Sequence, residues 1–174
     1  AGMLNSLRRE SLEQIRLARI APKQINGRSV CAACSLPAQE KLLIVQSESL
    51  SAAKELMACG ADVFEWQPQV YREQELTRAL DENPDVQPAL VLPAVLHSDE
   101  LAHLYEWVCR NTARLSGVVA NNPGQFELKW PVPVWGGQGL NVMNAECAKF
   151  FTALGAQRLT ASCELNLKEL RDLY

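Results

Sequence analysis

Histidine is nearly absent from this chain of 174 residues, which contains only His97 and His103. The sequence also lacks the G-x-S-x-G turn that presents a catalytic serine and the H-E-x-x-H helix that binds zinc. Hydrolysis by a nucleophile needs that nucleophile, a base and an orienting group, so these absences argue against a protease with a well-understood mechanism. His97 follows an expected strand and is a candidate general base. The alternative is a hydrogen-bonded loop residue.

Long apolar runs are missing as well. No stretch approaches the roughly 20 apolar residues of a membrane span, and residues 1–6 lack the charged and apolar regions of a signal peptide. The six cysteines are few for this length, which favours reduced thiols over a disulfide framework. These features predict a cytoplasmic protein that has no membrane contact.

Metal-ligand motifs are sparse too. Cys31 and Cys34 have C-x-x-C spacing, but no second pair follows at zinc-finger spacing. Two ordinary loop thiols and a redox or metal pair therefore both remain open. We predict no metal site.

Positive charge is scarce outside the first 30 residues. That segment holds six basic and two acidic side chains, a net charge of +4, which leaves −7 for the remainder of a chain whose net charge is −3. Its apolar residues recur every three to four positions. We expect a basic amphipathic helix and linker over 1–30, followed by a second domain over 31–174. The RNA-binding candidates are Arg8, Arg9, Arg16 and Arg19. A solvated helix face is the alternative.

The second domain repeats one pattern, in which a short apolar strand is followed by a helix. About six strands are expected, at 41–46, 62–67, 88–93, 117–122, 133–135 and 158–162. The helix after the fifth strand is expected to open within 140–144 and to end at Gly155, and Asn166 with Glu169 should form a capping box for the last helix. Apolar strands that alternate with helices indicate a parallel sheet.

The size of the domain limits how this sheet closes. A complete (β/α)8 barrel needs about 250 residues, so we predict an incomplete TIM-like barrel; the alternative is an open doubly wound sheet. Such a domain is expected to belong to a larger protein. An exposed apolar edge could also support a homo-oligomer.

In parallel α/β folds, the carboxyl ends of the strands form the pocket. Glu65 and Glu164 lie near strand ends and could face one cavity as catalytic carboxylates with raised pKa values; capping or salt-bridged carboxylates are the alternative. Polar side chains in the same positions are substrate-binding candidates: Gln138, Asn141, Asn144, Asn121, Asn122 and Ser162. The asparagines could equally satisfy turn backbone.

Two segments near the end of the chain carry a family resemblance. Gly139–Asn144 and Arg158–Asn166 resemble the "G-L-N-V-x-N" and "S-x-E-L" segments of the collagenase-like peptidase family U (number thirty-two). Residues 7–12 resemble the lead into the second half of longer members, those similar to the bacterial ribosomal RNA cytidine hydroxylation proteins. The resemblance implies a barrel module that works with the remainder of its own polypeptide and with RNA.

The resemblance also implies a cofactor. Family members that hydroxylate RNA or a quinone precursor are expected to hold an iron–sulfur cluster, whose four cysteines lie beyond the segment that matches the end of this chain. We therefore expect no cofactor in this fragment and no activity from it alone. Two alternatives remain, a non-catalytic structural or interaction domain and a collagenase-like peptidase.

Overall fold

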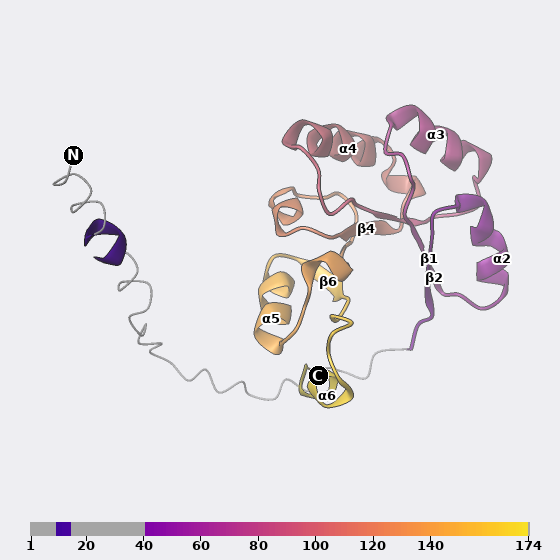
Figure 1. The fold of residues 1–174 in the computed structure, drawn as a ribbon. Helices are drawn as coiled ribbons and strands as arrows, with labels where there is room; N and C mark the ends of the chain where they lie inside the picture. The colour runs from indigo at the N-terminus through magenta and orange to yellow at the C-terminus, as the bar shows by residue number, and fades with distance from the viewer. Residues whose placement is uncertain (1–9, 15–40, 174) are drawn as a thin grey trace. The chain divides into compact units, whose positions relative to one another are not determined.

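A computed structural model describes residues 10–14 and 41–173 of the chain (Figure 1). The chain divides into two compact units, Ala1–Cys34 and Ser35–Tyr174. In the first unit, the described residues 10–14 are helical. The predicted RNA-binding residues Arg8, Arg9, Arg16 and Arg19, and the pair Cys31 and Cys34, lie outside the described residues.

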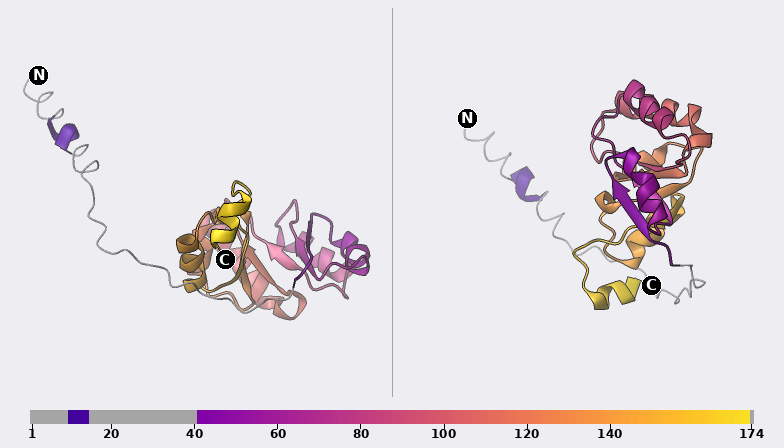
Figure 2. Two further views of the ribbon diagram at one scale, coloured as in Figure 1. Left: turned by 90° about the horizontal axis from the view of Figure 1, so that it is seen from below. Right: turned by 90° about the vertical axis from the view of Figure 1, so that its right-hand side faces the viewer.

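The second unit contains a curled sheet of six parallel strands (Figures 1 and 2). The strands are β1 (Ile44–Ser47), β2 (Val63–Trp66), β3 (Ala89–Val91), β4 (Gly117–Ala120), β5 (Val134–Gly136) and β6 (Ala156–Leu159). Each strand pairs with the next along the chain, and every pairing is parallel. A doubly wound sheet reverses its strand order partway, so the sequential order confirms the incomplete barrel and excludes the open doubly wound alternative.

Helices alternate with these strands, as predicted. The α-helices are α2 (Ala53–Ala58), α3 (Glu73–Glu82), α4 (Ser98–Arg110), α5 (Ala145–Ala153) and α6 (Leu167–Leu173). The short 3-10 helices of this unit are η1 (Leu50–Ala52), η2 (Thr112–Arg114), η3 (Pro123–Glu127) and η4 (Gln138–Leu140). Among the described residues, none of the helices has the length and apolar character needed to cross a bilayer.

The main core lies between the outer face of the sheet and helices α2, α3 and α4. Phe64, Leu90 and Val118 point outward from three neighbouring strands into this core. Trp107 of α4 is 1% exposed, and its indole N–H donates to Thr77 Oγ1 at 2.9 Å. A buried indole normally finds such a partner, so this bond fixes α4 against α3.

The inner, concave face of the sheet is lined by smaller side chains and one large ring. Ala89, Val91, Val119 and Trp135 form a separate apolar cluster there. The Trp135 ring lies against Gly117 of the neighbouring strand, where an added Cβ would stand 3.5 Å from the ring. The Trp135 ring therefore covers the start of β4 on the concave face.

Two helix boundaries were predicted correctly. Gly155 adopts φ +106° at the end of α5, a conformation that glycine tolerates best. Asn166 Oδ1 accepts from the Glu169 backbone N–H at 3.1 Å, and Glu169 Oε2 accepts from the Asn166 N–H at 2.9 Å. The predicted capping box of the last helix is thereby confirmed.

Two other boundaries were wrong. Helix α5 begins at Ala145 instead of within 140–144, because Asn141 is left-handed with φ +47° and Asn144 is the N-cap. Strand β6 spans Ala156–Leu159, whereas we predicted 158–162. Beyond its end, the Thr160 N–H donates to Gly136 O at 2.8 Å, and an isolated parallel bridge joins Val142 to Ala161. Ser162 therefore follows the sheet instead of ending a strand.

Candidate functional site

A cavity of about 530 Å³ lies over the concave face, at the carboxyl ends of the strands. Its polar side chains come from five strands or from the turns that follow them: β1, β2, β4, β5 and β6. Strand β3 and the Pro93–Ala94 turn contribute apolar residues. The polar side chains are Gln46, Glu65, Gln67, Asn121, Gln138 and Thr160. This is the edge at which parallel βα folds place their ligands.

Glu65 is the carboxylate of this cavity. It occupies the inner face of β2, opposite Gln46 on β1 and Ala89 on β3. Burial raises the pKa of Glu65 above its ordinary value, and the positive charge of Arg158 offsets part of that rise. The prediction of a strand-end carboxylate with a raised pKa is therefore met at Glu65.

Side-chain amides surround this carboxyl group. Gln46 Nε2 donates to Gln67 Oε1, which joins the ends of β1 and β2. Gln138 in η4 also lines the cavity and is exposed. Amide groups both donate and accept hydrogen bonds, so the cavity can bind a neutral polar ligand that presents both kinds of group.

Asn121 has a structural role as well as a place in the cavity. Its Nδ2 donates to Leu92 O at 2.9 Å, and its Oδ1 accepts from the Gly139 N–H at 3.0 Å. These two bonds hold the ends of β3 and β5 to the end of β4. The run Gly136–Gly139 is close-packed: an added Cβ at Gly137 would lie 2.4 Å from Asn121 Oδ1.

Gln125 was missed by the sequence analysis. Its side chain is 2% exposed, and its Oε1 accepts from the backbone N–H groups of Asn121 and Asn122 at 2.8 and 3.2 Å. Its Nε2 donates to Pro93 O at 2.6 Å. The residue thus holds together the turns after β3 and β4, which form one wall of the cavity.

Arg158 was also missed. It lies on β6 opposite Trp135 of β5, with its guanidinium carbon 4.4 Å from the centroid of the Trp135 ring. An arginine within a short strand is the only sequence signal that could have drawn attention to it. Its position places a positive charge on the concave face.

The remaining substrate-binding candidates do not line the cavity. Asn122 Oδ1 accepts from the Gly124 N–H at 2.9 Å, and Asn144 Oδ1 accepts from the Cys147 N–H at 2.8 Å. Asn141 ends η4, and Ser162 is buried with its Oγ accepting from the Glu164 N–H at 3.3 Å. These contacts match the alternative in which such side chains satisfy turn backbone.

The other two catalytic candidates also lie apart from Glu65. Glu164 is exposed in the turn before α6, and it is not part of the cavity lining. His97 is the exposed N-cap of α4, and its backbone N–H donates to Glu100 Oε2 at 2.9 Å. The cavity thus brings together Glu65, Asn121 and Gln138, but not Glu164 or His97.

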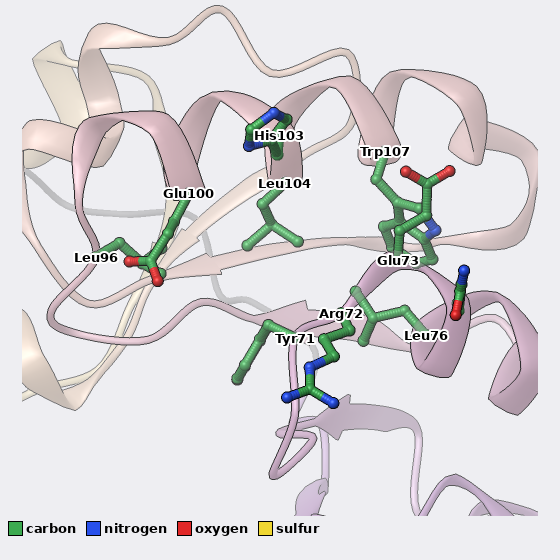
Figure 3. Close-up of a pocket in the computed structure, with 10 residues that line it drawn as sticks. Tyr71, Arg72, Glu73, Leu76, Leu96, Glu100, His103, Leu104 and Trp107 are labelled. Carbon is green, nitrogen blue, oxygen red and sulfur yellow. The ribbon is translucent and has the colours of Figure 1, made fainter.

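A larger cavity of about 640 Å³ opens between α3 and α4 on the outer side of the sheet (Figure 3). Leu76, Leu104 and Trp107 form its apolar floor. Its two carboxylates already have partners in the fold: Glu73 pairs with Arg110 at 2.9 Å, and Glu100 binds the backbone of His97. We therefore place the candidate site at the smaller cavity, where the polar groups converge.

The described residues do not fit an iron–sulfur cluster. Their four cysteines are Cys59, Cys109, Cys147 and Cys163, and they are free thiols. No three His, Cys, Asp or Glu side chains in the described part of the chain gather to hold a metal ion. A cluster needs several converging thiolates, so no step of chemistry is assigned to one here.

The raised pKa of Glu65 predicts a pH-dependent stability. The folded protein holds this proton more tightly than the unfolded chain, so stability is lost as pH rises from near 4.5 through the raised folded value. Glu65→Gln cannot ionise, so it should gain stability relative to the wild type as pH rises from near 4.5. Urea unfolding over this rise in pH measures the difference, and Glu164→Gln in the exposed turn is the matched control. A difference for Glu65→Gln that stays constant with pH would contradict the assignment.

Comparison with known proteins gives no relative. Neither a protein-family model, nor a curated protein, nor a solved structure matches the chain.

Proposed function

We propose that the chain is a substrate-binding module of an RNA-modifying enzyme of the peptidase-like family it resembles. In this proposal, the module contributes to hydroxylation of a cytidine in ribosomal RNA. The observation that carries the proposal is the cavity at the carboxyl ends of the strands, in which Glu65 is surrounded by side-chain amides. Other regions of the same polypeptide would supply the iron–sulfur cluster.

The chemistry of the lining supports a base as the ligand. Glu65 can accept a hydrogen bond from the exocyclic amino group of cytosine, an acceptor–donor pair that proteins use to read this base. Gln138 offers a donor for a ring nitrogen or carbonyl oxygen. Uracil presents an acceptor where cytosine presents its amino group, so an ionised Glu65 disfavours uracil.

The accessibility of the cavity also supports the proposal. Enzymes that act on a base need it out of the helical stack, and they read its hydrogen-bonding edge within a pocket. The cavity opens over the carboxyl ends of β3 and β4, where Val91 and Val119 line it. Its volume of about 530 Å³ is within the range of small-ligand pockets and can hold a single unstacked base.

The test is binding of a short single-stranded RNA that contains one cytidine within uridines. We expect the full chain to prefer it over the all-uridine RNA, and Glu65→Gln or Gln138→Ala to reduce that preference about tenfold. Fluorescence anisotropy of the labelled RNA measures both affinities. Gln87→Ala is the matched control, since the exposed Gln87 bonds Ala113 O outside the cavity. Equal affinity for both RNAs would refute the proposal.

An interaction domain is the second candidate function, and the β1 edge favours it. Among the described strands, β1 pairs only with β2, and Leu42, Leu43 and Ile44 are 42, 55 and 37% exposed at or just before β1. An apolar edge strand is a template for pairing with another chain or segment. If neither RNA binds, this second function becomes the preferred one.

A further inference from the structure

We infer that Arg158 is an oxyanion-binding residue, and that the ligand of the concave face carries a phosphate or carboxylate group that its guanidinium binds. The inference rests on the proposed function only for the identity of the nucleotide. It goes beyond that function by assigning a charged group to the ligand.

The Arg158 guanidinium is held in place by a neighbouring aromatic ring. Arg158 projects from β6 onto the concave face, and Trp135 of β5 supports the flat guanidinium at 4.4 Å from the ring centroid. Trp135 in turn lies on Gly117 of β4. This stacking restricts the guanidinium before any ligand binds, which reduces the ordering that binding requires.

One nitrogen of the Arg158 guanidinium is a hydrogen-bond donor without an acceptor among the described residues. Arg158 Nη1 is buried and has no hydrogen-bond partner among residues 10–14 and 41–173. Buried donors of a charged group are costly to leave without an acceptor. An acceptor from outside the described chain is therefore favoured at this nitrogen, and a two-oxygen anion matches the paired donors of a guanidinium.

Glu65 is the carboxylate of the concave face that the charge of Arg158 affects. Glu65 and Arg158 influence each other electrostatically, but they form no direct ion pair. Burial raises the pKa of Glu65, and its carboxyl does not occupy the guanidinium through an ion pair. Arg158 is the charged group that acts on Glu65 from the strands around it, and the facing Gln46 and Ala89 are neutral. An anion at Arg158 would thus add proton affinity to Glu65.

The experiment compares cytidine with cytidine 5′-monophosphate by calorimetry, using the full chain. We expect the monophosphate to bind at least about tenfold more tightly, and Arg158→Gln to abolish that advantage. Arg158→Lys, which keeps the charge but loses the planar fork, should retain only part of it. Arg72→Gln is the matched control, because Arg72 is exposed before α3, away from the concave face. Circular dichroism verifies that each variant is folded.

Competition identifies the source of the anion. Displacement by inorganic phosphate but not by succinate indicates a phosphate, and displacement by succinate indicates a carboxylate site; either result supports the inference. Equal affinity for cytidine and its monophosphate overturns the inference while the proposed function stands. Arg158-dependent binding of phosphate or succinate without any binding of cytidine supports the inference and counts against the proposed function. Binding of none of the four probes overturns both. If Arg158→Gln is unfolded, a monophosphate advantage that persists unreduced in Arg158→Lys overturns the inference.

Discussion

Replacing Gln125 with leucine is expected to lower the free energy of unfolding by about 3 kcal/mol or more. The substitution keeps a side chain of similar size but removes the hydrogen-bond partner of three backbone groups. These groups are the N–H groups of Asn121 and Asn122 and the carbonyl of Pro93. Each group left unsatisfied in a buried place costs about 1–3 kcal/mol. Urea unfolding monitored by circular dichroism measures the change.

The matched control for Gln125 is Gln87→Leu. Gln87 also donates from its side chain to a backbone carbonyl, Ala113 O at 3.1 Å, but it is exposed. Water can replace that bond, so the control should change the free energy of unfolding by less than about 1 kcal/mol. Similar losses for the two variants would show that the Gln125 side chain does not hold the two turns together.

The second large effect is expected at Gly139. An added Cβ would lie 2.4 Å from Asn121 O and 2.8 Å from Asn121 Cβ. The first of these atoms belongs to the backbone at the end of β4, so it cannot rotate away as a side-chain tip could. Gly139→Ala should therefore destabilise the fold by about 3 kcal/mol, near the upper part of the range for overpacking.

Gly124→Ala is the control for this prediction. Its nearest atom would be Asn122 Oδ1 at 3.3 Å, the end of a side chain that can shift slightly. Thermal unfolding of both variants separates the two cases, with a much larger drop in midpoint for Gly139→Ala. An unchanged midpoint for Gly139→Ala would mean that the loop after β5 moves freely, and the cavity wall built on it would lose its support.

The strand and helix order could be predicted from the sequence because the signal is local. Continuous apolar runs such as 117–120 mark strands covered on both faces, and glycines such as Gly155 mark helix ends. The incomplete barrel followed from six such repeats and the length of the chain. Glu65 could be placed at the cavity because alternation along β2 fixes the face that it occupies.

The rest of the site depends on contacts between distant segments. Gln125 lies in a 3-10 turn, and nothing near it in sequence indicates that it will meet Pro93. Glu164 was predicted to face the cavity because β6 was extended to Ser162. The strand instead begins directly after Gly155, which moves the polar residues into the following turn. A strand that ends three residues earlier than expected was enough to separate Glu164 from Glu65.

The sequential order of the strands has a consequence for biosynthesis. Each strand of the sheet needs only its predecessor, already made, as a pairing partner. The sheet can therefore grow strand by strand as the chain leaves the ribosome, without waiting for a distant segment to return. In the described part of the chain, the arginine of the concave face comes from β6, so the growing sheet acquires this positive charge last.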